Sequence, residues 1–241
     1  MKAFLRKYAA VYFFLQRARY ALLQICEHII GTTFQECRWR IRHLLKPHWA
    51  DDHIKSVSHP HRAYWIEKVG AYAPVKTVLE IGCNAGPNLS ILSRHFPDIQ
   101  CYGIDINRNA IANGGQWFVR EHLPRVELAF GKADDLRRYK DKSIDVVMSD
   151  ATLLYVGPDK IKKVLSEIER VCVKAMIFLE FHEPLSNLCR LYDARWIYNY
   201  EMVCQMYLPS ATYKLSKLPK DAHHDPSWQM YGFFIEISLP R

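Results

Sequence analysis

One acidic residue and two glycines stand where an apolar run gives way to a helical pattern, in the spacing Glu80-x-Gly82-x-x-x-Gly86. The apolar run covers residues 75–81 and reads as a buried strand. Glycine lets the backbone turn sharply and approach a ligand that a side chain would block. The helix that follows would point its first amide groups at the same place. This strand–glycine–helix pattern predicts a pocket for a nucleotide-like ligand.

A second carboxylate, Asp105, ends the next predicted strand, residues 100–105. In nucleoside-binding Rossmann units, an acidic residue at this place accepts hydrogen bonds from the ribose hydroxyls. We therefore expect a ribose at Asp105. The third glycine of the dinucleotide pattern is missing after Gly86, which disfavours a nicotinamide cofactor.

Residues 78–89 and 103–107 resemble motifs I and II of class I S-adenosylmethionine (SAM)-dependent methyltransferases. Residues 131–136 and 149–156 resemble motifs III and IV, and the resemblance spans about residues 59–240. Lys132 departs from the family, which commonly has an acid there, and Lys174-Ala175 replaces a glycine pair. The resemblance implies SAM as the cofactor. The residues that it implies for cofactor binding are Glu80, Gly82, Cys83, Asn84, Gly86, Asp105, Ile106, Ala133, Asp134 and Asp150.

A methyl acceptor that carries a hydroxyl benefits from a general base. Our first candidate is His182, because it directly follows the fifth predicted strand on the ligand side of the sheet. Asp150 and Tyr155, from the motif IV segment, are further catalytic candidates, and so are His223 and His224 from a late loop. A structural histidine remains the alternative for His182.

No metal site is predicted. The histidines at positions 48, 53, 59 and 61 are close in sequence, but their spacing fits no known zinc pattern. The resemblance instead makes His59, Arg62 and Tyr64 candidates near the carboxylate of SAM.

The remaining segments must position these residues. Strands are expected over 125–130, 143–151, 175–180, 211–218 and 230–239, and helices over 88–96, 109–122 and 160–173. A loop and helix are expected over 182–191, and a further helix over 192–205. The predicted fold class is α/β: a seven-stranded, mostly parallel, doubly wound sheet with an antiparallel C-terminal hairpin, plus an N-terminal helical extension.

Charge is concentrated in that extension. The chain of 241 residues has a net charge of +8, and residues 1–46 hold nine Lys and Arg against only Glu27 and Glu36. Apolar residues recur at three- and four-residue steps over residues 3–30, which predicts an amphipathic helix. We therefore divide the chain into a basic helical extension, 1–58, and a methyltransferase domain, 59–241.

Two interpretations of the extension stay open. A basic amphipathic helix can lie on an anionic membrane surface, and the same helices can instead pack on their own domain, form a lid over the acceptor, or pack on a twin subunit in a homodimer. A nucleic-acid partner is not expected, because residues beyond 46 are nearly neutral. The chain has seven cysteines, an odd number, and no Cys-x-x-Cys motif. Both observations favour a reducing, cytoplasmic location.

The function predicted from the sequence is methyl transfer from SAM to a hydroxyl or amine of a small molecule or glycan, an activity of the EC 2.1.1 class. Two alternatives remain: a SAM-binding interaction protein without catalysis, and a nicotinamide-dependent oxidoreductase.

Overall fold

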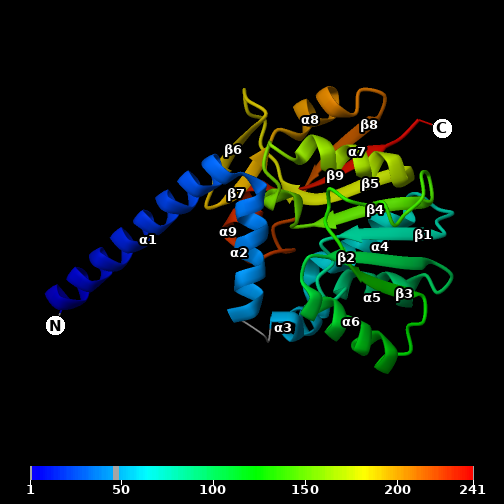
Figure 1. Ribbon diagram of the computed structural model, residues 1–241, viewed down its shortest axis with the longest axis horizontal. Coiled ribbons are helices and arrows are strands. Elements are labelled where there is room, and N and C mark those ends of the chain that lie inside the picture. The colour runs from blue at the N-terminus through cyan, green and yellow to red at the C-terminus, as the bar shows by residue number, and fades with distance from the viewer. Residues whose placement is uncertain (1, 46–48, 241) are drawn as a thin grey trace.

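The computed structural model describes residues 2–45 and 49–240. Lys46, the last of the nine basic residues counted over residues 1–46, and His48 lie outside the described residues, as do Met1, Pro47 and Arg241. A seven-stranded sheet organises the chain (Figure 1). In spatial order its strands are β3 (Val126–Phe130), β2 (Gln100–Asp105), β1 (Thr77–Ile81), β4 (Ile144–Asp150), β5 (Cys172–Phe181), β9 (Gly232–Ser238) and β8 (Thr212–Lys217).

Strands β1 to β5 pair in parallel, and β9 runs antiparallel to both β5 and β8. The predicted doubly wound sheet with an antiparallel C-terminal hairpin is confirmed. Because the parallel strands end at the same edge, the residues that follow β1, β2 and β4 meet there.

Helices cover both faces of the sheet (Figure 1). On one face, α4 (Tyr64–Gly70), α5 (Pro87–His95) and α9 (Pro226–Tyr231) contribute Trp65, Leu89 and Trp228 to a buried cluster. Helix α6 (Arg108–Arg120) lies against β2 and β3. On the other face, α7 (Ile161–Val171) and α8 (Tyr200–Tyr207) pack against the strands.

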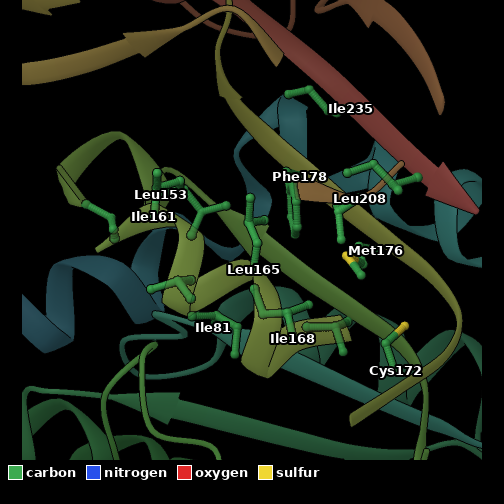
Figure 2. Close-up of a cluster of buried hydrophobic side chains, with 14 of the residues drawn as sticks. Ile81, Leu153, Ile161, Leu165, Ile168, Cys172, Met176, Phe178, Leu208 and Ile235 are labelled. Carbon is green, nitrogen blue, oxygen red and sulfur yellow. The ribbon is translucent and has the colours of Figure 1, made fainter. Parts of the chain in front are cut away.

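The position of α7 on the second face is explained by one apolar stripe of the helix. Ile161, Leu165 and Ile168 recur at helical spacing and are fully buried. Figure 2 shows them beside Met176 and Phe178 of β5. The opposite surface of α7 carries Lys and Glu side chains, so burial of one apolar stripe fixes the helix on the sheet.

The residues between β5 and α8 differ from the prediction. Instead of helical segments, β6 (Cys189–Tyr192) and β7 (Arg195–Tyr198) form an antiparallel hairpin. Asp193 and Ala194 both have positive φ angles, as a two-residue hairpin turn requires. Trp196, Ile197 and Tyr198 are buried in β7. The prediction of a helix over 192–205 was therefore wrong for its first half, because this aromatic run packs as a strand.

The N-terminal extension consists of α1 (Lys2–Ile30) and α2 (Thr32–Leu45), which meet at Gly31. Figure 1 shows α1 as a long arm that reaches away from the sheet, while α2 lies against the body of the protein. Apolar side chains along α1 are exposed, among them Phe14, Leu22 and Ile29. None of the helices within the described residues is long and apolar enough to cross a membrane.

A short helical segment joins α2 to the sheet. It comprises α3 (Trp49–Lys55), the 3₁₀ turns η1 (Ser56–Ser58) and η2 (Pro60–Ala63), and then α4. The division after residue 58 falls between η1 and η2, where His59 has an extended backbone, and the domain boundary stays a prediction.

Candidate active site

The turn after β1 has the backbone that the glycine spacing predicts. Gly82 and Gly86 have φ angles of +73° and +80°, a region that favours glycine. A Cβ atom at Gly82 would lie 2.0 Å from Oγ1 of Thr152, in the segment that follows β4. The turn therefore packs tightly against a second loop, and glycine is needed there by the fold as well as by any ligand.

Two adjoining cavities open at this edge of the sheet. The larger has a volume of about 280 Å³ and the smaller of about 260 Å³. They share five lining residues: His53, Gly82, Asn84, Asp150 and Ala151. The cavities thus form one continuous cleft over the ends of β1, β2 and β4, where open α/β sheets bind ligands.

Most residues predicted to bind the cofactor lie around this cleft. The larger cavity is lined by Gly82, Asn84, Asp105, Ile106, Ala133, Asp134 and Asp150. The smaller cavity adds Glu80 and Cys83. Gly86 lines neither cavity, because it faces Phe118 of α6. The structure therefore brings together nine of the ten, and their roles remain predictions.

Asp105 is held rigidly at the end of β2. Its two carboxylate oxygens accept the backbone N–H groups of Asn84 at 2.8 Å and Asn107 at 2.7 Å. Burial raises the pKa of Asp105 to about 6, although these amides lower it. The carboxylate is fixed in orientation and keeps further lone pairs for a ligand in the larger cavity.

Asp150, at the end of β4, is the most heavily contacted acid of the cleft. Its Oδ2 atom lies 3.0 Å from Nε2 of His61, 3.0 Å from Nδ2 of Asn88 and 3.3 Å from Nε1 of Trp65. Burial would raise the pKa of Asp150, but His61 and Arg62 hold it well below its usual range. Asp150 is therefore an anion that orients its neighbours.

Glu80 has the opposite electrostatic character. Its Oε1 atom accepts a hydrogen bond from Asn88 at 2.7 Å, while its buried Oε2 atom has no hydrogen-bond partner among the described residues. Burial, and to a lesser extent the charge of Asp150, raises the pKa of Glu80 to about 8. An unpaired carboxyl oxygen in a cleft is costly unless a ligand meets it.

Arg62 is buried beside these acids, and three of its five N–H donors are already used. Its guanidinium binds the backbone oxygen and hydroxyl of Ser56 and, at 2.6 Å, Oδ1 of Asn88. Arg62 thus links the η1 turn to α5 at the wall of the smaller cavity.

The five catalytic candidates come together only in part. Asp150 and Tyr155 line the larger cavity, Asp150 and His223 line the smaller one, and His182 and His224 line neither. His182 is 5% exposed, and its Nδ1 atom accepts the backbone N–H of Tyr200 at 3.1 Å. Burial lowers the pKa of His182. Strand β5 ends beside His182, as predicted. The side chain of His182 is nevertheless enclosed by β7 and α8, as the side chain of a structural histidine would be.

Helix α2 forms a wall of the larger cavity. A lid made by the extension was one of the open interpretations, but the residues that dock it were not predicted. Thr32, Gln35, Glu36 and Trp39 all line this cavity. Glu36 pairs with Lys132 at 2.5 Å and with Lys160 at 2.7 Å. At the end of α1, Glu27 accepts a hydrogen bond from Nε1 of Trp196 at 2.9 Å.

A signal for this contact was present in the sequence. Residues 1–46 hold only two acidic residues, Glu27 and Glu36, and both of them contact the sheet domain. The two isolated acids of this basic segment are thus the residues that hold it against the sheet domain.

Comparison with known proteins agrees with this geometry. The family model of a methyltransferase domain matches residues 78–175. An uncharacterised protein from Haemophilus influenzae is 27% identical over 108 residues, which are 44% of this chain and 42% of that protein. The chain thus spans less than half the length of this curated relative.

Two solved structures show the same fold. A SAM-dependent methyltransferase from Aquifex aeolicus is 16% identical, with a TM-score of 0.58 over 78% of this chain and 98% of that one. Phosphoethanolamine N-methyltransferase 1 from Haemonchus contortus is 13% identical, with a TM-score of 0.62 over 88% of this chain and 50% of that one.

Proposed function

We propose that this chain, whose residues 78–175 match a methyltransferase domain, is a class I SAM-dependent methyltransferase that moves a methyl group from SAM to a hydroxyl or an amine of a small molecule or glycan. The observation that carries this proposal is the meeting of Glu80, Gly82 and Asp105 around one cleft.

The residues of the cleft fit the cofactor. Asp105 would accept hydrogen bonds from the ribose hydroxyls, and Ile106, Ala133 and Asp134 would surround the adenine in the larger cavity. The unpaired Oε2 atom of Glu80 would accept a hydrogen bond from the ammonium group of SAM. When bound, SAM supplies a methyl group that its positively charged sulfur has already activated.

Positioning is the main task left to the protein, because an activated methyl group reacts once donor and acceptor are held in line. Asp105 and Asp150 are carboxylates fixed by hydrogen bonds at the cleft. Such preorganised charge complements a cation without reorganising during the reaction.

We place the acceptor in the smaller cavity. His59, His61 and His223 line it beside Asp150. Asp150 accepts the hydrogen bond of His61 and so directs the other ring nitrogen of that histidine away from β4. That nitrogen, Nδ1, contacts Nδ1 of His59 at 2.5 Å, so the two imidazoles together can receive or share the proton of an acceptor hydroxyl or ammonium. Asp150 therefore serves as a positioning residue.

We also propose that α1 attaches an otherwise cytoplasmic protein to an anionic membrane surface. Its described side chains expose Val11, Leu15, Leu22 and Ile25 along the arm, and residues 1–46 carry net charge +7. Exposed apolar surface with basic charge is the pattern of interfacial helices. Self-association of α1 in a homodimer is the competing outcome.

Transfer of labelled methyl groups tests the enzymatic proposal. The full chain would be incubated with methyl-labelled SAM and pooled metabolites and glycans, and label would be followed into products. Incorporation that depends on Asp105 supports a methyltransferase. Tight SAM binding without incorporation would favour the alternative of a non-catalytic SAM-binding protein.

A further inference from the structure

Three histidines from distant parts of the chain meet at the wall of the smaller cavity. His59 and His61 flank Pro60 at the η2 turn, and His223 lies in the loop before α9. One ring nitrogen from each lies within 4.8 Å of the other two. This arrangement could not be seen in the sequence spacing, because His223 is far away along the chain.

The cluster is close to the size of a metal site. Zinc–nitrogen bonds of about 2.0–2.1 Å at tetrahedral angles would place ligand nitrogens roughly 3.4 Å apart. The Nδ1 atoms of His59 and His61 are 2.5 Å apart, and the widest separation in the cluster is within 4.8 Å. The rings would need to shift by only about 1 Å or slightly more to enclose a tetrahedral cation.

Asp150 supplies the outer contact that such sites use. Metal-binding histidines usually donate their second ring N–H to a carboxylate, which fixes the ring and its tautomer. Nε2 of His61 lies 3.0 Å from Oδ2 of Asp150, which Asn88 also contacts at 3.0 Å. The lone pair of His61 is therefore directed at Nδ1 of His59.

His223 needs the largest adjustment. The backbone N–H of Asp225 donates to Nδ1 of His223 at 3.1 Å. A neutral imidazole that binds a metal through either nitrogen cannot keep this bond. Metal binding would thus exchange one hydrogen bond in an exposed loop for a metal–nitrogen bond.

We propose that His59, His61 and His223 bind one divalent transition-metal ion of the zinc type. Three neutral imidazoles suit zinc, cobalt or copper rather than magnesium or calcium. Three protein ligands leave a fourth position, as in catalytic zinc sites, and here the cluster faces the smaller cavity. An acceptor hydroxyl could occupy that position and become more acidic. This role rests on the proposed function, whereas metal binding itself does not.

Cobalt provides a direct probe of the site. The full chain, purified without a histidine tag and freed of metal with a chelator, would be titrated with Co²⁺ while its visible absorption is followed. We expect one ion per chain, a spectrum typical of tetrahedral coordination, and displacement of cobalt by Zn²⁺.

Two neighbouring histidines provide a matched pair of variants. His223→Ala should weaken cobalt binding at least tenfold. His224→Ala should leave it unchanged, because His224 is exposed and its ring centre lies 6.3 Å from that of His59. Circular dichroism would confirm that both variants are folded.

Three results would overturn the metal site: no cobalt binding at tens of micromolar, equal binding by His223→Ala and wild type, or equal loss in both variants. SAM titration of the metal-free protein separates this inference from the proposed function. If SAM binds and cobalt does not, the metal site is wrong and the methyltransferase proposal stands.

Discussion

Glu36 on α2 pairs with Lys160 at 2.7 Å across the larger cavity, and so joins the N-terminal extension to the turn before α7. A second pair, with Lys132, closes the same contact from the loop after β3. The side chain of Glu36 is only 14% exposed. Burial is the largest single effect on the pKa of Glu36 and raises it, but the two lysines together outweigh burial and lower the pKa. Helix α2 of the extension therefore forms part of the wall of the larger cavity, while α1 reaches away from the sheet (Figure 1).

Glu36→Gln should loosen this wall. Since the variant loses both ion pairs, we expect SAM to dissociate faster and its dissociation constant to rise by about fivefold, which corresponds to roughly 1 kcal/mol. Stopped-flow and equilibrium titration would measure the two effects. Glu121→Gln is the matched control, because it removes the exposed pair with Arg94 outside the cleft. Tighter SAM binding by Glu36→Gln would mean that α2 competes with the cofactor instead.

Glu80 should make the stability of the protein depend on pH. Its pKa is raised from 4.5 to about 8 by burial, so the folded protein keeps a proton that the unfolded chain loses above pH 4.5. The free energy of unfolding should therefore fall as pH rises from about 4.5 to about 8, by on the order of a few kcal/mol. Asp105 and Glu180 also have raised pKa values and act in the same direction.

A comparison with Glu80→Gln isolates the effect of Glu80. The variant cannot titrate at this position, so its urea unfolding should change less between pH 5 and pH 8 than that of wild type. Parallel stability curves for the two proteins over this interval would show that Glu80 is ionised in the folded protein at neutral pH.

His182→Ala should act on stability more than on cofactor binding. The substitution leaves a cavity and removes the acceptor for the N–H of Tyr200, at a cost of about 1–3 kcal/mol for the unpaired group. SAM affinity and turnover per folded molecule should stay near wild type. A large fall in turnover with unchanged stability and SAM affinity would restore His182 as a catalytic residue.

The exposed apolar stripe of α1 can be tested without deleting the helix. Leu15→Glu combined with Leu22→Glu changes residues that are 60% and 61% exposed, so folding should be unaffected. We expect wild type to co-sediment with anionic vesicles and to be released by salt, while the double variant stays in solution.

A control for charge alone is Val119→Glu on α6, where the native side chain is 77% exposed. This variant should bind vesicles as wild type does. Self-association of wild type without lipid, and its loss in the double variant, would mean that α1 contacts a twin subunit rather than a membrane.

Positions that depend only on a residue's own strand or turn were the ones predicted best from the sequence. Asp105 and Asp150 end β2 and β4, and Glu80 lies one residue before the end of β1. Because β1 pairs in parallel with both of these strands, the meeting of the three acids follows from strand order. Gly82 was expected to make room for a ligand, whereas its closest neighbour in the structure is Thr152. That contact depends on how two loops pack, which spacing does not encode.

Contacts between distant segments escaped prediction for the same reason. His223 joins His59 and His61 only because the loop before α9 folds back over η2. Glu36 reaches Lys132 only because α2 turns back at Gly31 toward the cleft. A residue far along the chain can be placed only once the packing of its own element is known.

Whether the cleft binds SAM through Asp105 can be measured by calorimetric titration of the full chain with SAM, its demethylated product and NAD. The same titrations would be repeated with Asp105→Ala. We expect both SAM and its product to bind wild type, NAD to give no heat of binding, and Asp105→Ala to bind SAM at least about tenfold more weakly, since charge-assisted hydrogen bonds contribute about 1.5–3 kcal/mol each. Micromolar binding of NAD with no response to SAM, or equal affinity of wild type and a folded Asp105→Ala for SAM, would contradict the account.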